Sequence, residues 1–130
     1  VGGKMYRKCV GDFGEMVARR LLTDLGYEII KGKFHTRYGE IDLIAQEENQ
    51  LVFIEVKTRM TAVYGSGFEA ITKKKRENMI RAAWCYLQRS NYRDLPCRFD
   101  ILSLTLNGKG LLIGHELVRN AFGVEGGNYY

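Results

Sequence analysis

The sequence predicts a single α/β domain in which a mixed β-sheet is flanked by helices. Three observations lead to this fold class. The predicted elements follow in the order helix, three strands, helix, two strands. A helix between the strands that begin at residues 51 and 98 predicts a parallel crossover, whereas the hairpins predict antiparallel pairs. The length of 130 residues suits one hydrophobic core. We expect the domain to cover residues 5–122, with residues 1–4 as an appended segment and 123–130 as a flexible tail.

The first part of the chain predicts one helix followed by a short strand. Residues 12–25 are typical of an amphipathic helix, because apolar residues recur every four positions from Phe13 onward. Gly26 is a natural end for this helix, since glycine readily adopts the left-handed conformation of a helix C-terminus. A strand over Tyr27–Ile30 and a polar loop over Lys31–Tyr38 are expected to follow.

A β-hairpin is predicted next. The segments Ile41–Gln46 and Leu51–Thr58 are rich in apolar and β-branched residues, and the polar stretch Glu47–Gln50 separates them. If the turn is centred between Glu48 and Asn49, paired residues have numbers that add up to 97, whether the loop has two residues or four.

The second part of the chain predicts a helix and another hairpin. A loop marked by Gly65 and Gly67 precedes a helix from about Phe68 to Leu87, where apolar positions follow helical spacing. After the loop Asn91–Pro96, two strands flank a clear turn signal. These segments are Arg98–Leu106, Asn107–Gly110 and Leu111–Val118.

Composition excludes several classes of protein. Apolar residues make up 45% and charged residues 27% of the chain, as in ordinary globular domains. No stretch is long and apolar enough for a transmembrane helix, so we expect a cytoplasmic protein. The three cysteines form no C-x-x-C pair, and His35 and His115 are far apart, which argues against a zinc site. Neither a Walker loop nor a G-x-G-x-x-G motif is present, so nothing supports a nucleotide-binding enzyme.

The positive charge is concentrated in one segment. The chain has 20 Lys and Arg against 15 acids, for a net charge of +5. Residues 71–98 alone carry a net +6, whereas residues 1–70 are neutral. A surface that faces phosphates has this pattern, and so does an ordinary solvated helix face. The candidate phosphate-binding residues are Lys73, Lys74, Lys75 and Arg76 on the predicted helix, together with Arg37 and Arg59. The alternative for Arg37 and Arg59 is that they are ordinary surface charges.

Carboxylates that could carry chemistry gather in the first hairpin. Alternation puts Glu55 and Lys57 on the same face of their strand. The predicted register places Asp42 directly opposite Glu55, with Cβ atoms roughly 5 Å apart. Two ionised carboxylates at that distance repel, so the pair requires a cation, a shared proton or open water. A divalent metal ion suits it, with Lys57 near the substrate phosphate or the attacking water. The alternative is a solvated ion-pair cluster.

Glu15 is a further candidate. It lies at the edge of the apolar stripe of the first predicted helix, in a row with Ala18 and Leu22, so its side chain is expected to point toward the sheet. The other reading is an ordinary glutamate in the first turn of a helix, where the helix dipole favours a negative charge.

Five short motifs follow one another along the chain. They are Gly14-Glu15, Gly39-Glu40-Ile41-Asp42-Leu43-Ile44-Ala45, Val52-Phe53-Ile54-Glu55-Val56-Lys57-Thr58-Arg59, Glu69-Ala70-Ile71 and Arg98-Phe99-Asp100-Ile101. Together they resemble the YraN-like family of small uncharacterised proteins over about residues 10–118. That family is similar to the PD-(D/E)xK nucleases and, among them, to archaeal Holliday-junction resolvases.

The resemblance implies a restriction-endonuclease-like fold and a metal-dependent endonuclease. In that reading Asp42 and Glu55 are the metal-binding acids, Lys57 is the catalytic lysine and Glu15 is the additional helix acid of resolvase-like members. Ile41 stands where a proline usually precedes the aspartate. The implied cofactor is Mg²⁺ or Mn²⁺, and the implied partner is nucleic acid, DNA above all, in branched or repair and recombination structures. A homodimer is implied by analogy with resolvases, which cut two strands symmetrically.

Two other functions remain open from the sequence. The same surface could bind nucleic acid without cleaving it, because membership of a fold superfamily does not fix activity. The acids could also form a structural ion-pair network in a scaffold protein.

Overall fold

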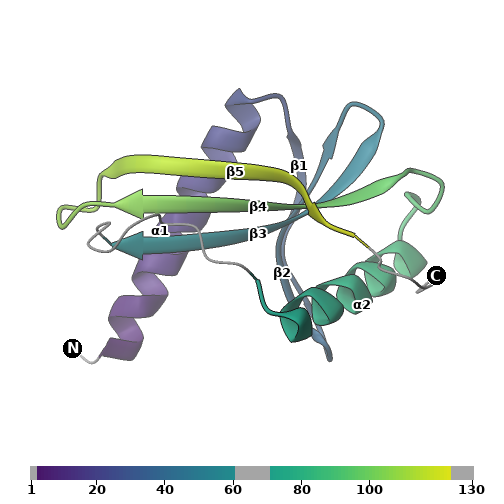
Figure 1. Cartoon of the computed structure of the whole chain (residues 1–130), viewed down its shortest axis with the longest axis horizontal. Coiled ribbons are helices and arrows are strands. Elements are labelled where there is room, and N and C mark those ends of the chain that lie inside the picture. Colours follow the sequence, from purple (N-terminus) through teal and green to yellow (C-terminus); the bar gives the residue numbers. More distant parts are fainter. Residues whose placement is uncertain (1–2, 61–70, 124–130) are drawn as a thin grey trace.

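The computed structural model describes residues 3–60 and 71–123, and it contains one five-stranded mixed sheet with a helix on each face (Figure 1). The strands lie in the order β1-β2-β3-β4-β5. Neighbouring strands are antiparallel except β3 and β4, which are parallel. The elements are α1 (Gly3–Asp24), β1 (Glu28–Thr36), β2 (Gly39–Glu47), β3 (Gln50–Met60), α2 (Lys73–Arg89), β4 (Cys97–Leu106) and β5 (Leu112–Phe122). The predicted order of elements and the parallel crossover are therefore confirmed.

Four predicted boundaries were wrong by more than two residues, one of them the end of β5, which continues to Phe122 instead of ending at Val118. Helix α1 begins at Gly3 rather than at residue 12, inside the segment that we expected to be appended. Strand β1 continues to Thr36 through the predicted polar loop, because an edge strand pairs on one side only and tolerates exposed polar residues. Helix α2 begins at Lys73, where the Thr72 side chain caps it by accepting a hydrogen bond from the Lys75 backbone N–H. The predicted loop at Gly65 and Gly67, the predicted helical residues 68–70 and residues 124–130 of the predicted tail lie outside the described residues.

Helix α1 covers one face of the sheet. Its buried residues Ala18 and Leu22 pack against Leu43, Val52 and Ile54 of the central strands. Apolar burial on this scale contributes about 1.5–3 kcal/mol for each large side chain. The helix ends at Asp24, one residue before its predicted end, and Gly26, the predicted stop, follows with a φ of +101°.

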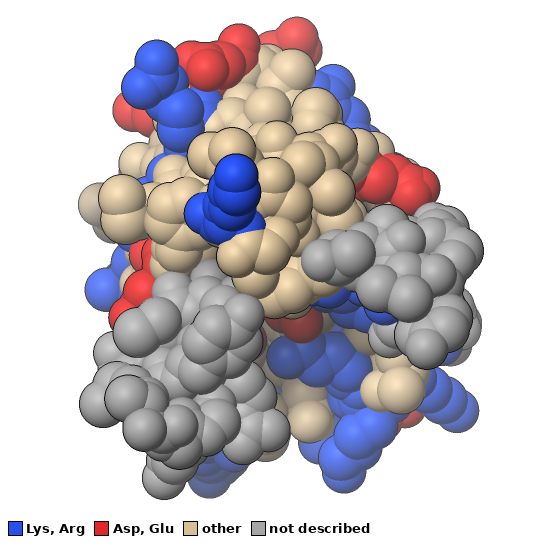
Figure 2. All heavy atoms as spheres, turned by 90° about the vertical axis from the view of Figure 1, so that its left-hand side faces the viewer, with Lys and Arg blue, Asp and Glu red and all other residues tan. Residues whose placement is uncertain are grey.

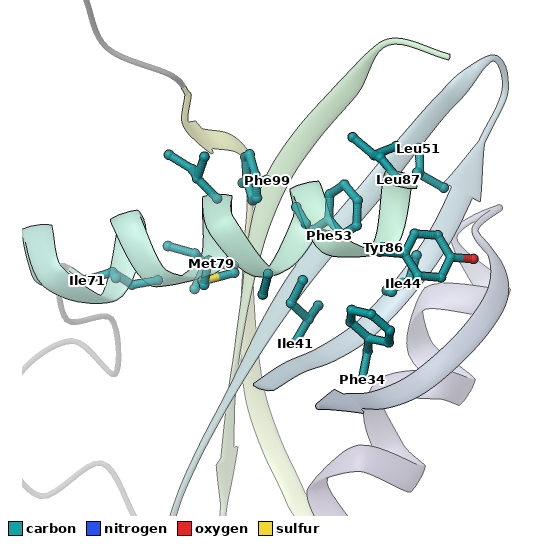
Figure 3. Close-up of a cluster of buried hydrophobic side chains, with 14 residues drawn as sticks. Phe34, Ile41, Ile44, Leu51, Phe53, Ile71, Met79, Tyr86, Leu87 and Phe99 are labelled. Atoms are coloured by element: carbon teal, nitrogen blue, oxygen red, sulfur yellow. The ribbon is translucent and has the colours of Figure 1, made fainter. Parts of the chain in front are cut away.

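Helix α2 covers the opposite face. Met79, Ala83 and Tyr86 of α2 belong to the same buried cluster as Phe34 of β1 and Phe53 of β3 (Figure 3). The Tyr86 ring meets Phe34 edge-on at 5.3 Å between centroids. These contacts fix α2 against the β1–β2 side of the sheet.

Strand β2 separates from β3 halfway along β3. Their pairing ends at Leu43 and Ile54, whereas β3 stays paired with β4 as far as Met60. Ile41 and Ile44 both pack toward α2, although they are three residues apart, so the strict alternation of faces is broken in β2. In Figure 1, β3, β4 and β5 run side by side while β2 diverges from them. The residues that follow Leu43 and Ile54 in the register therefore lie where the sheet opens.

A buried ionic network connects the strand ends near the β2–β3 turn, at the end of the sheet opposite to the acid-bearing opening. Asp100 is fully buried and accepts hydrogen bonds from the Tyr27 hydroxyl at 2.7 Å, Arg98 Nε at 3.0 Å and the Asn120 backbone N–H at 2.9 Å. Arg98 also ion-pairs with Glu47 beside the β2–β3 turn. Burial, with help from Asp100, raises the pKa of Tyr27 to about 12. These partners come from four parts of the chain, so the network fastens the strand ends together.

Over the described residues, neither helix has the length and hydropathy that crossing a membrane requires.

Candidate active site

Asp42 and Glu55 form an acid pair at the point where β2 leaves β3. The observed register pairs Leu43 with Ile54 and Glu47 with Gln50, as the turn at residues 48–49 predicts. The ladder stops one residue before Asp42 and Glu55, so the two are not a paired position of the sheet. They are nevertheless neighbours, because Asp42 accepts a hydrogen bond of 2.8 Å from the Val56 backbone N–H and interacts with the Glu55 carboxyl group.

Burial makes the Asp42 carboxyl group difficult to ionise. The Asp42 pKa is raised from 3.8 to about 7, first by burial and then by the negative charge of Glu55. The Val56 backbone N–H donates a hydrogen bond of 2.8 Å to Asp42 Oδ2 and opposes this rise. Only 13% of the Glu55 side chain is exposed, and its Oε1 atom is buried without a hydrogen-bond partner. The pair therefore has an acceptor oxygen that lacks a donor or a cation.

Two lysines lie on the same face as this pair. Lys75 of α2 places its Nζ atom 3.5 Å from Glu55 Oε2, and it is one of the charges that lower the Asp42 pKa. Lys57 follows Glu55 by two residues on β3, and it pairs in register with Ser103 of β4. The Ser103 hydroxyl is buried without a hydrogen-bond partner. Lys75 was expected to contact the nucleic-acid backbone, and its position at Glu55 was not expected.

The donor set suits a hard divalent cation. Mg²⁺ and Mn²⁺ prefer carboxylate oxygens, and Mg²⁺ is commonly held by one or two carboxylates with water and substrate phosphate. The unpartnered Oε1 of Glu55 and the mutual repulsion in the pair are what a bound cation would relieve. Among the side chains that the structure describes, no three His, Cys, Asp or Glu residues group closely enough to hold a metal ion. The pair is thus the acidic part of this candidate site.

Glu15 lies apart from the acid pair. Its carboxylate contacts Arg19 Nε at 3.3 Å on α1 and lies beside Gly32 of β1. Helix α1 packs on the face that Val52 and Ile54 share, whereas Glu55 alternates with them and follows Phe53 onto the α2 side. The expectation that Glu15 points toward the sheet fits its position over β1. It does not complete a cluster of three acids with Asp42 and Glu55 within the described part of the chain.

The predicted basic residues of α2 do not form one surface. Lys73 and Lys74 are exposed, Lys75 contacts Glu55, and Arg76 Nη1 donates a 2.9 Å hydrogen bond to the Ile71 carbonyl. Arg59 is half-exposed and follows Lys57 by two residues on β3. Figure 2 shows Lys and Arg side chains gathered in the lower half of one face, around a hollow in which an acidic side chain is visible.

Arg37 belongs to a second basic region at the β1–β2 turn. Its guanidinium lies 4.9 Å from the centre of the Tyr38 ring, and Arg81 of α2 lies 5.7 Å from the same ring. Trp84, on the next turn of α2, is 36% exposed. Sequence reasoning missed Arg81 and Trp84. Their spacing of three residues indicates a shared helix face and could have identified them. The sequence pattern does not, however, show that the β1–β2 turn packs beside that face.

Comparison with known proteins gives consistent relatives. A model of the family described as "Uncharacterised protein family UPF0102" matches residues 14–104. A UPF0102 protein of Caldicellulosiruptor saccharolyticus is 37% identical over 118 residues, which cover 91% of this chain and 100% of the relative. A UPF0102 protein of Caldanaerobacter subterraneus subsp. tengcongensis is 39% identical, with 92% and 98% of the two chains covered. A third, from a Sulfurihydrogenibium species, is 40% identical over 88% of this chain and 95% of the relative.

Proposed function

The chain belongs to the uncharacterised protein family UPF0102, and we propose that it is a metal-dependent endonuclease that hydrolyses phosphodiester bonds in DNA. The proposed substrates are branched DNA or other repair and recombination structures. The proposal includes a restriction-endonuclease-like fold of the PD-(D/E)xK type. The observation that carries it is the acid pair, half-buried where β2 leaves β3 and flanked by lysines on the same face.

The acid pair has the properties of a metal-binding pair. Asp42 and Glu55 would hold Mg²⁺ or Mn²⁺, because each offers carboxylate oxygens and Glu55 Oε1 has no other partner. The Val56 backbone N–H keeps Asp42 Oδ2 oriented through a 2.8 Å hydrogen bond. A bound divalent ion supplies a water of lowered pKa and stabilises the negative charge that develops on the phosphoryl group.

The two lysines have separate proposed roles. Lys57 follows the acid pair on β3 and would orient the attacking water or neutralise the scissile phosphate. Lys75 reaches Glu55 Oε2 from α2, with its side chain 42% exposed. Its ion pair with Glu55 is solvent-accessible, so the lysine would be able to turn toward an incoming phosphate. Lys73 and Lys74, exposed on the first turn of α2, would add affinity for the backbone without reading bases.

A cleavage panel tests the proposal. Four-way junctions, flapped duplexes, linear duplexes and single strands would be incubated with Mg²⁺ or Mn²⁺, beside a chelator control. We expect cleavage of at least one branched substrate that requires the metal ion. The Asp42→Asn and Glu55→Gln variants should bind the same substrate and not cleave it. Cleavage that survives both substitutions would contradict the assignment of the site.

A second candidate function is nucleic-acid binding without cleavage. It is favoured by the position of Lys75, which already neutralises Glu55, and by the absence of a third acid from the group in the described residues. In that case branched DNA should bind with an affinity that falls steeply with salt, but no metal ion should produce cleavage. The same panel therefore separates the two functions.

A further inference from the structure

A groove lined by arginines and aromatic rings lies between the β1–β2 turn and the outer face of α2. Its volume is about 700 Å³, which is in the range of ligand-binding clefts. Residues 36–38 form one wall, and the other wall comes from α2. Arg81, Trp84 and Arg89 of α2 line it, at spacings that keep them on neighbouring rows of the helix. We call this region the arginine groove.

The groove combines positive charge with aromatic surface. Arg37, Arg81 and Arg89 line it, and no acidic side chain does so among the described residues. The Arg37 and Arg81 guanidinium groups lie over the Tyr38 ring, at 4.9 and 5.7 Å from its centre. Trp84 is 36% exposed although it is a large aromatic residue. Guanidinium groups recognise phosphate oxygens, and exposed aromatic rings stack on bases.

Tyr38 and Lys75 lie between the arginine groove and the acid pair. Tyr38 also lines a smaller hollow of about 100 Å³, whose other wall includes Lys75 and Asn78 of α2. Lys75 in turn contacts Glu55 at 3.5 Å. Lys75 and Arg81 are six residues apart on one helix, about 9 Å along its axis. Glu40 also lines this smaller hollow, so Lys75 is the cation that balances an acid between Tyr38 at the edge of the groove and the acid pair.

We propose that the arginine groove binds single-stranded DNA, with a base stacked on Trp84 and the backbone phosphates on Arg37, Arg81 and Arg89. A base in a duplex is stacked on its neighbours, so its face can reach Trp84 only when the strand is unpaired. This inference rests on the proposed function and deepens it. It specifies that the substrate has an unpaired segment next to the bond that is cut.

Trp84 itself reports on the groove, because the chain contains one tryptophan. The protein would be titrated in EDTA with an unlabelled oligonucleotide of twelve thymidines, a duplex of twelve base pairs, thymidine monophosphate and a poly-glutamate peptide. We expect the single strand to quench Trp84 fluorescence and to bind at least about tenfold more tightly than the other three probes. Equal quenching by the duplex, the mononucleotide or the acidic peptide would overturn the proposal.

Variants of groove residues locate the binding. Arg81→Gln should weaken binding of a fluorescein-labelled single strand at least about fivefold and reduce the salt slope of log K by about 0.7, which corresponds to one lost phosphate contact. Trp84→Ala should weaken it at least about fivefold through lost stacking. The matched control is Arg20→Gln on α1, an exposed arginine paired with Asp24 at 3.5 Å on the opposite face of the sheet. Circular dichroism would verify the fold of each variant.

The outcomes separate this inference from the proposed function. If no DNA is cleaved but the single strand quenches Trp84 in wild type and Arg81→Gln weakens its binding, the groove assignment stands and the nuclease assignment fails. If branched DNA is cleaved while Trp84 does not respond to the single strand, the groove assignment fails alone. Equal weakening by Arg20→Gln and Arg81→Gln would also overturn the groove, because the effect would then be one of net charge.

Discussion

Lys75 Nζ lies 3.5 Å from Glu55 Oε2 and thereby joins the first turn of α2 to the central strand β3. The contact brings a positive charge to the acid pair, in which burial and the charge of Glu55 raise the Asp42 pKa. It also connects the basic first turn of α2 with the acid pair. Several consequences can be measured.

The first consequence concerns Lys75. The Lys75→Met substitution removes a charge that lowers the Asp42 pKa, so the Asp42 pKa should rise further above its ordinary value. The carboxyl carbon resonance of Asp42, followed by NMR as a function of pH, would measure this. Lys74→Met removes an exposed lysine from the same turn and serves as the control. Identical titration curves for both variants would contradict the role given to Lys75.

The second consequence is a pH dependence of stability. An unfolded Asp42 loses its proton near pH 4, whereas the folded one keeps it until about pH 7. Between these values the folded state binds more protons, so the free energy of unfolding should fall as pH rises and level off above 7. Urea unfolding at several pH values would measure the slope. Asp42→Asn should flatten it and Glu28→Gln, at an exposed site on β1, should not. Equal slopes in wild type and Asp42→Asn would refute this account.

The third consequence concerns divalent ions. Protons and metal ions compete for the same carboxylates, so Mn²⁺ should raise the melting temperature more at pH 8 than at pH 5.5. The rise should disappear in the Asp42→Asn/Glu55→Gln double variant. Glu15→Gln is an informative comparison, because the Glu15 carboxylate contacts Arg19 on the other side of the sheet. If Glu15→Gln abolishes the shift and the double variant keeps it, the metal site has been assigned to the wrong acids.

The fourth consequence concerns the buried network around Asp100. Asp100→Leu would leave the Arg98 guanidinium, with 10% of its side chain exposed, without its buried partner. Such losses cost about 3–5 kcal/mol. Urea unfolding should therefore show a decrease of that order, against less than about 0.5 kcal/mol for Asp94→Asn in the exposed loop before β4. A decrease for Asp100→Leu as small as that of the loop variant would mean that the network contributes little.

The sequence was sufficient to predict the acid pair but not its surroundings. The register of β2 and β3 follows from a short polar turn between two apolar strands, and loops of two or four residues give the same pairing, which the structure shows from Glu47 and Gln50 to Leu43 and Ile54. The extent of β1 could not be predicted, because Lys33 adopts a positive φ of 49° and the pairing with β2 shifts between Ile29 and Lys31. Both irregularities hide the alternation that identifies a strand.

Helix packing accounts for the other differences. A periodic pattern predicts that α2 covers the sheet, but the angle at which it crosses depends on how Tyr86 fits against Phe34 and Phe53. The orientation of α2 places Lys75 next to Glu55 and Arg81 next to Tyr38. The position of Glu15 beside Gly32 was equally unpredictable, because it depends on how α1 lies across β1 and β3.

The most direct test of the central claim is the rate of cleavage of a branched DNA in a single turnover with Mg²⁺, comparing wild type with Asp42→Asn. The substitution keeps the shape of the side chain and removes the charge that would hold the metal ion. We predict metal-dependent cleavage by wild type and a rate at least about a hundredfold lower in the variant, with DNA affinity unchanged within about twofold. Equal cleavage rates in the two proteins would contradict the claim that the acid pair is the catalytic centre.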